Sequence, residues 1–252
     1  MSWSPVLVYG VLAALANILG GLWVSSQQKP SDRTLKYLIA IGAGFMLAAV
    51  FLKVIPASLN LKAWQGEVPT VMSLVLLGYL AIQFFEHTLA SHFHFGEETH
   101  SDAMLSRHAA ITAVGGLAIH TFFDGVSIAS GFAIDTRLGL LIFIAILLHK
   151  LPEGFTVASI MLAAGRSRKV AQRASVFVGL VTLLGVISIS LLERAVVYAL
   201  PISAGVTLYV AASDLIPEVN TNAERDKVSL AVFGGVALYY GTETVLDLLH
   251  IG

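Results

Sequence analysis

Long apolar runs separated by short polar clusters make up most of the chain. A helix that crosses the hydrocarbon core of a bilayer needs about 20 predominantly apolar residues. Strand-like alternation is absent, and only helices or closed barrels satisfy the backbone in lipid. We therefore predict an all-α integral membrane protein with one transmembrane domain over residues 1–252. The eight expected spans are 5–26, 34–57, 69–92, 107–132, 136–164, 170–193, 195–217 and 228–250.

Composition supports a bilayer as the solvent. Hydrophobic residues make up 56% of the chain and charged residues 12%, whereas soluble domains carry about 25% charged residues. The net charge of -1 gives no indication of a nucleic-acid partner. The absence of cysteine excludes disulfides and thiolate metal sites. The first run has no basic residue before it and is too long for a signal-peptide core, so we expect it to be retained as a span.

Basic residues are distributed unequally between the alternate loops, which predicts the orientation. Both termini are expected outside, in agreement with an even number of spans. The loops expected in the cytoplasm contain Lys29, Arg33, Lys36, Arg107, Arg166, Arg168, Lys169, Arg173, Arg225 and Lys227. The opposite loops contain Lys62, Arg137 and Arg194.

Two matched pairs of ionisable residues stand inside the fourth and fifth apolar runs. His120 and Asp124 are four residues apart, as are His149 and Glu153. This spacing places each pair on one face of a helix, one turn apart. A charge at mid-bilayer costs at least ~2.5–3.5 kcal/mol, so each needs a partner or a purpose. The short connection between the two runs predicts antiparallel neighbours, whose pairs meet at one depth.

Two imidazoles and two carboxylates are a donor set for a divalent transition metal. Zinc is the first candidate, and Fe2+, Mn2+, Co2+ and Cd2+ accept the same ligands, whereas the lack of thiolates disfavours copper(I). A structural hydrogen bond between helices is the alternative explanation for any single pair. Pro152 favours a kink beside His149 because it frees the carbonyl of Leu148. Gly125 and Gly154 follow the two carboxylates and permit close helix approach or serve gating.

On these residues the chain resembles the ZIP (Zrt-/Irt-like) family of metal-ion transporters. The specific matches are HTFFDGVSIASGF over 120–132 and HKLPEGF over 149–155, with weaker matches in the second, third and seventh runs. The resemblance implies eight helices, outside termini and metal import toward the cytosol. It also admits a homodimer. The expected address is a plasma membrane, in first place the bacterial inner membrane.

Two positions depart from the family pattern. ZIP proteins often hold a second metal through an asparagine after the first histidine and an acidic residue after the second, positions occupied here by Thr121 and Lys150. The sixth run also lacks a carboxylate within its apolar core. We therefore expect a single-metal site in which Lys150 takes the place of the second cation and neutralises Glu153. Snorkelling or a structural pair is the alternative for Lys150. Lysine after the fifth-span histidine is typical of one branch of the family.

Further ionisable residues suggest a path toward and away from the centre. They could relay metal or protons, or they could be interfacial residues that face water. The candidates for this path are Lys53, near the outer end of its run, and Glu86, His87, Asp214 and Glu218, near the cytoplasmic ends. Glu243 and Asp247 also lie in the outer part of their run. The loop histidines His92, His94 and His100 could bind metal weakly or be solvated surface.

Two functions compete with transport. An intramembrane zinc-dependent hydrolase would use three protein ligands and a water, but the chain has no HExxH spacing and its ligands come as matched pairs. A proton-conducting or structural membrane protein would use the same ionisable set without metal. We expect a transporter and not an enzyme, with metal as the substrate and not as a resident cofactor.

Overall fold

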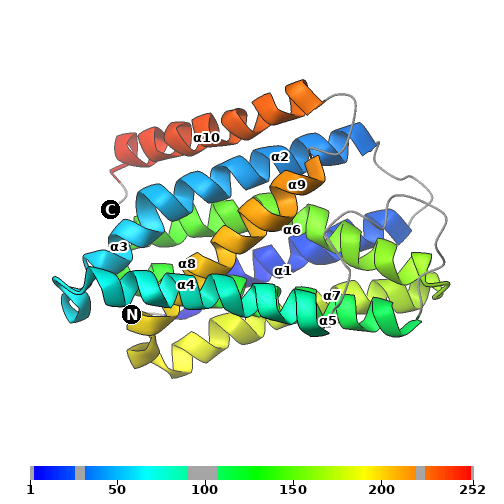
Figure 1. Cartoon of the computed structure of the whole chain (residues 1–252), viewed down its shortest axis with the longest axis horizontal. Helices are drawn as coiled ribbons and strands as arrows, with labels where there is room; N and C mark the ends of the chain where they lie inside the picture. Colours follow the sequence, from blue (N-terminus) through cyan, green and yellow to red (C-terminus); the bar gives the residue numbers. More distant parts are fainter. Residues whose placement is uncertain (1–2, 26–31, 90–106, 220–224, 251–252) are drawn as a thin grey trace.

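Long helices that run along one common direction build the molecule (Figure 1). The computed structural model describes residues 3–25, 32–89, 107–219 and 225–250. The long helices are α1 Trp3–Ser25, α2 Asp32–Ala49, α4 Val68–Phe84, α5 Arg107–Ile134, α6 Thr136–Ala163, α7 Arg168–Leu191, α8 Val196–Tyr209 and α10 Arg225–Leu248. The shorter segments are η1 Val50–Val54, α3 Ile55–Leu59, η2 Lys62–Trp64, η3 Phe85–Leu89, η5 Glu193–Ala195, η6 Val210–Leu215 and α9 Ile216–Val219.

Each of the eight predicted runs is helical in the part of the chain that is described. Six helical segments there are long and apolar enough to cross a membrane: Pro5–Ser25, Arg33–Leu59, Ala110–Ile134, Thr136–Ala163, Arg168–Leu191 and Glu193–Leu215. The third run contains the shorter apolar helix α4, and the eighth corresponds to α10. The sixth and seventh runs divide at Leu192, where α7 ends before the single turn η5.

α6 has a capping residue before its first turn and a glycine after its last. A single residue, Asp135, separates α5 from α6, and its side chain caps the new helix by accepting a hydrogen bond from Leu138 N at 2.9 Å. Such a cap satisfies one of the free N–H groups of the first turn. Gly165 follows α6 with a positive φ of 69°, a conformation that favours glycine at a helix C-terminus. The short link at Asp135 makes α5 and α6 antiparallel neighbours, as predicted.

Two π-helical turns precede prolines in α2–α3 and α8–α9. The N–H of Ile55 bonds to Val50 O, and the N–H of Ile216 bonds to Ala211 O. Pro56 and Pro217 come next in each case and have no N–H to continue the α-helical ladder. A π-type hydrogen bond forms directly before each proline, and the helix continues beyond it. Lys53 and Asp214 lie in these two turns.

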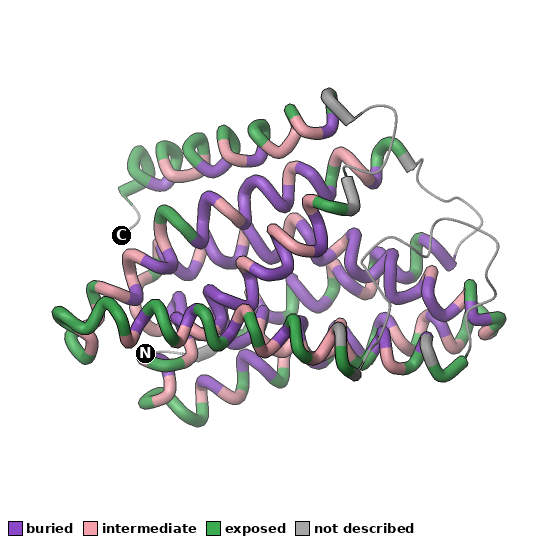
Figure 2. Tube along the Cα trace, in the orientation of Figure 1, coloured by how far each residue is buried: buried purple, intermediate pink, exposed green. Residues whose placement is uncertain are grey.

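Four helices form the bundle that surrounds α6. α1 packs on α6 and α7, and α5 packs on the same two helices. α2 packs on α6 from the other side and is covered by α10, while α4 pairs with α8. Figure 2 shows the result as a largely buried interior with exposed positions on the outer helices. α1 begins and α10 ends at the same end of the bundle (Figure 1).

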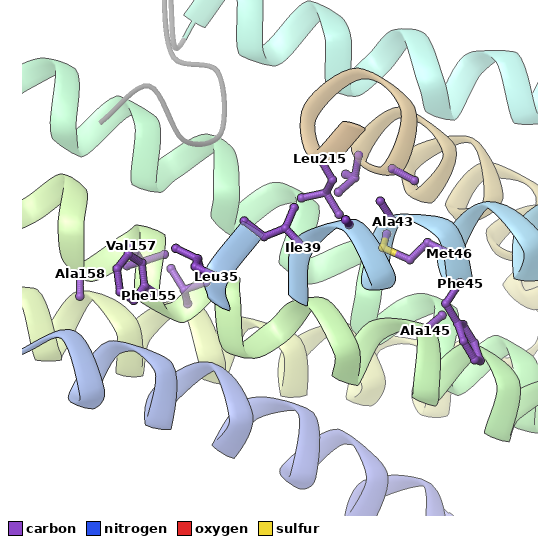
Figure 3. Packing of buried hydrophobic residues seen from close by; sticks show 14 of the residues in the cluster. Leu35, Ile39, Ala43, Phe45, Met46, Ala145, Phe155, Val157, Ala158 and Leu215 are labelled. Atoms are coloured by element: carbon purple, nitrogen blue, oxygen red, sulfur yellow. The ribbon is translucent and has the colours of Figure 1, made fainter. Parts of the chain in front are cut away.

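The largest hydrophobic cluster joins α2 to α6. Leu35, Phe45 and Met46 of α2 belong to one cluster with Ala145 and Phe155 of α6 (Figure 3). Other leucines are exposed on the outer surface of the helices, for example Leu19 of α1 at 57% and Leu184 of α7 at 57%. An apolar surface of this extent suits contact with lipid.

Candidate metal centre

The two sequence pairs meet between α5 and α6. α5 provides His120 and Asp124, and α6 provides His149 and Glu153. All four side chains are buried, and one ligand atom from each lies within 4.8 Å of the other three. The structure thus brings together the four residues that the spacing selected. It places them in the interior of the bundle, where an uncompensated carboxylate would be costly.

The distances within this cluster suit a small cation. Asp124 Oδ2 lies 3.1 Å from His120 Nε2 and 3.3 Å from His149 Nε2. Glu153 Oε2 lies 3.5 Å and 3.9 Å from the same two nitrogens. A tetrahedral zinc ion, bound at about 2.0–2.1 Å, would hold its ligand atoms about 3.3 Å apart. The buried His/Asp/His/Glu cluster therefore fits a metal site in spacing and in donor type.

The backbone of α6 fixes which nitrogen His149 presents. Its Nδ1 lies 3.0 Å from the carbonyl oxygen of Ala145, one turn earlier in the helix. A carbonyl only accepts, so Nδ1 carries the proton and donates. Nε2 then keeps its lone pair and faces the carboxylates. This is the arrangement by which an outer hydrogen bond orients a metal-binding histidine.

Lys150 is the positive charge of the centre. Its Nζ lies 2.7 Å from Asp124 Oδ2 and 2.5 Å from Glu153 Oε2. A third hydrogen bond, of 3.2 Å, goes to Thr121 Oγ1, and the lysine side chain has an exposure of 0%. All three N–H donors of the ammonium group are therefore used. Lys150 does not snorkel; it bridges both carboxylates, whereas the sequence had suggested Glu153 alone.

Glu153 is the most heavily hydrogen-bonded member. Its Oε1 accepts from the Thr121 hydroxyl in a short bond and from Asn17 Nδ2 at 3.0 Å. Asn17 comes from α1 and is fully buried. This residue was not among those predicted for the centre, although an asparagine inside the first apolar run is itself a signal. A lone amide in lipid needs a partner, as an ionisable residue does.

Glycines bring the neighbouring backbones up to the centre. A Cβ at Gly154 would lie 1.8 Å from the carbonyl oxygen of Asn17, and one at Gly125 would lie 2.0 Å from that of Thr182. Both contacts are possible only without a side chain. The prediction that these two glycines permit close helix approach is confirmed, with α1 and α7 as the partners.

The residues predicted to form a path fall at two separate places. Asp214 is buried in η6, where it interacts with Glu86 of η3 and lies within electrostatic range of His120. Its Oδ1 has no hydrogen-bond partner in the described part of the chain. Lys53 pairs with Glu243 at 3.4 Å. Arg137, from the first turn of α6, forms ion pairs with Glu243 and Asp247.

Some of the predicted path and loop residues lie beyond what the structure describes. His92, His94 and His100 fall outside the described residues. The side chains of His87 and Glu218 fall outside them as well, although their backbone positions belong to η3 and α9.

Comparison with known proteins agrees with this geometry. The family described as ZIP Zinc transporter matches residues 91–242, a stretch that contains both paired motifs. The chain belongs to this family. The polar pairs of the chain lie on the adjacent helices α5 and α6. The structure adds an internal ammonium group between them.

Named relatives of the chain come from animals, a yeast and a bacterium. Zinc transporter ZIP9-B of Xenopus laevis is 30% identical over 190 residues, which is 71% of this chain and 60% of the relative. Zinc transporter YKE4 of Saccharomyces cerevisiae is 24% identical over 223 residues, 77% of this chain and 63% of the relative. Zinc transporter ZupT of Escherichia fergusonii is 26% identical over 260 residues, 99% of this chain and the whole of the relative. The chain thus spans about 60% of the length of ZIP9-B.

Proposed function

We propose that this ZIP-family chain is a multi-pass membrane transporter that moves a divalent transition metal through the centre formed by His120, Asp124, His149 and Glu153. Zinc is the expected substrate, and Fe2+, Mn2+, Co2+ and Cd2+ are accepted by the same donors. The observation that carries the proposal is the convergence of these four ligand atoms within 4.8 Å in the buried interior. The zinc-transporter names of the relatives support it.

The proposed topology has eight spans with both termini outside. Support comes from the excess of lysine and arginine in one set of loops and from the common end at which α1 begins and α10 ends (Figure 1). α4 and α10 would complete the eight together with the six longer apolar segments. Metal would move toward the cytosol. A bacterial inner membrane is the proposed address, and the bacterial relative ZupT agrees with it.

The centre would carry one metal ion at a time. Lys150 bridges Asp124 and Glu153, so with neutral histidines the two carboxylates keep one net negative charge. A divalent ion held by one net charge is bound less tightly than by two, and a carrier must release what it binds. Counting the metal in zinc-soaked crystals by anomalous scattering tests this proposal. One zinc is expected, and two adjacent ions would refute it.

The remaining polar residues would line the route to and from the centre. Asp214 and Glu86 form an acidic pair whose member Asp214 interacts with His120, so this pair is a proposed next stop for the metal. Lys53 belongs to an ion-pair cluster that joins α6 to α10. It would act at the outer end of the route, where metal enters. His87, Glu218 and the loop histidines stay candidates for the cytoplasmic exit. A homodimer of this chain stays a proposal as well.

A hydrolase in the membrane is the second function considered, and no observation favours it. All four ligands lie in one compact set, and Lys150 pairs with both carboxylates, so neither stands apart as a separate general base. The proposal is therefore a transporter without chemical turnover.

Uptake of radioactive zinc by bacterial cells tests both the activity and its direction. Cells that produce the wild-type chain should accumulate zinc above empty cells. The double variant His120→Ala/Glu153→Ala, present in the membrane at the same level, should return to the background. Zinc depletion by the wild type would reverse the proposed direction, and equal uptake by both forms would refute the proposed route.

A further inference from the structure

Asn17 is the polar residue of α1 that touches the centre. It has an exposure of 0%, and its neighbours Leu15 and Leu19 point outward with exposures of 46% and 57%. Its amide nitrogen donates to Glu153 Oε1 at 3.0 Å. Its backbone is held against α6 by the close approach at Gly154. The amide is thus fixed at its position by packing and by hydrogen bonding.

The orientation of this amide follows from the chemistry of its partner. A carboxylate only accepts, so the NH2 group of Asn17 must face Glu153. The opposite atom, Asn17 Oδ1, is then buried without a hydrogen-bond partner in the described part of the chain. A residue that served only to join α1 to α6 would gain by satisfying both atoms, because an unpaired buried acceptor is costly. The Asn17 side chain is therefore oriented to donate to Glu153, although its own carbonyl oxygen is left without a hydrogen bond.

The two oxygens of Glu153 have separate partners. Oε1 receives Asn17 and Thr121. Oε2 receives Lys150 and is the oxygen that lies 3.5 Å from His120 Nε2. The two donors on Oε1 fix the plane of the carboxylate, and the other oxygen, Oε2, is thereby kept directed toward the histidines.

We propose that Asn17 is a positioning residue for metal binding: it holds the Glu153 carboxylate so that Oε2 is presented to the two histidines. Asn17 turns its amide nitrogen, a hydrogen-bond donor, toward Glu153. The inference rests on the proposed metal centre, whose four ligands come from α5 and α6, and it assigns to α1 a direct effect on metal affinity. Outer hydrogen-bond partners of this kind typically change metal affinity by about 10–100-fold.

The test uses the full chain, purified and reconstituted in nanodiscs. Asn17→Leu keeps the approximate volume and removes the donor, and Asn17→Ala is the second variant if the leucine form does not fold. Ser25→Ala is the matched control, because Ser25 is a buried polar residue of the same helix whose hydroxyl donates to Gly21 O of its own helix. Three quantities are measured: the zinc dissociation constant, the melting temperature without metal, and the visible absorption spectrum of bound Co2+.

A positioning role predicts zinc affinity about 10–100-fold below wild type and an altered Co2+ spectrum at saturation, with Ser25→Ala unchanged in both. A merely structural role would lower the melting temperature and leave affinity and spectrum as in the wild type. Zinc affinity within twofold of the wild type in the folded variant would overturn the inference. If the wild type itself bound no zinc, the proposed metal centre would fail instead, so the two failures are distinguishable.

Discussion

The two carboxylates of the centre each face two kinds of partner, the histidines and the ammonium group of Lys150. Asp124 and Glu153 each contact histidine nitrogens and the Lys150 ammonium group through one oxygen. A metal ion at the centre would share these two oxygens with a cation that is tethered to the chain.

Replacement of Asp124 by asparagine removes a ligand charge and keeps the shape of the side chain. Zinc affinity should fall by more than about 100-fold, beyond the 10–100-fold typical of outer partners. Isothermal titration of the reconstituted protein measures the change. Glu67→Gln, at an exposed acidic residue far from the centre in sequence, is the control and should bind as the wild type does. Tight binding by Asp124→Asn would exclude Asp124 as a ligand.

Replacement of Lys150 by methionine leaves two buried carboxylates without their cation. Breaking a buried ion pair costs about 3–5 kcal/mol, so the metal-free variant should melt at a lower temperature than the wild type. Zinc should restore more stability to the variant than it adds to the wild type. Lys169→Met at an exposed lysine should change neither value. A variant whose melting temperature responds to zinc as the wild type does would contradict the role of Lys150.

Residue spacing predicted much of this centre. The four-residue interval placed each histidine beside its carboxylate, and the resemblance to the ZIP family directed attention to Thr121 and Lys150. The bridge from Lys150 to Asp124 could not be predicted, because it depends on the separation of α5 and α6. Asn17 could not be assigned to Glu153 either, since the two lie 136 residues apart in the chain.

At the scale of elements, the close approach of α1 to α6 decides how the centre is enclosed. Gly20 and Gly154 each lie against the backbone of the other helix, where a Cβ would come within 2.1 Å and 1.8 Å of a carbonyl oxygen. Small residues at helix contacts are the usual means of packing in membranes. Asn17 reaches Glu153 from α1 at this contact.

Gly154→Ala should separate α1 from α6 and destabilise the protein. Overpacking costs typically 1–3 kcal/mol, and the added methyl would meet backbone that has little room to move. Gly234→Ala is the matched control, because its Cβ would meet nothing within 4 Å, and alanine in an open helix position stabilises by up to about 1 kcal/mol. Unfolding in mixed detergent compares the two. Equal stability of both variants would contradict the close contact at Gly154.

The hydrophobic pattern predicted the positions of the long helices but not the π turns within them. Each of the eight apolar runs corresponds to a helix, because a run of this length has few alternatives in lipid. The π turns at 50–54 and 210–215 were missed. Pro56 and Pro217 indicate a disturbed ladder, but sequence does not say whether the helix kinks, ends or widens.

The whole molecule surrounds α6 with α1, α2, α5 and α7, while α10 and the paired helices α4 and α8 pack around this bundle (Figure 1). This arrangement was beyond sequence analysis for a physical reason. In lipid the outward and inward faces of a helix are both apolar, so the pattern gives little indication of which helices are neighbours. Only the short link at Asp135 allowed the contact of α5 with α6 to be predicted.

Single cysteines test the proposed topology without interference, since the chain has no cysteine of its own. His250→Cys, at an exposed site after α10, should react with an impermeant maleimide in intact cells. Ser167→Cys, at an exposed site in the turn between α6 and α7, should react only after the cells are permeabilised. Labelling of both positions in intact cells would contradict outside termini with an even number of spans.

The most direct test of transport through the buried centre uses purified protein in liposomes with a trapped fluorescent zinc indicator. The wild type should raise internal zinc when zinc is added outside, and folded His120→Ala/Glu153→Ala should follow protein-free liposomes. Ser25→Ala should behave as the wild type does. Zinc uptake that survives the double substitution would contradict the account, because the metal would then take a route that avoids the four buried ligands.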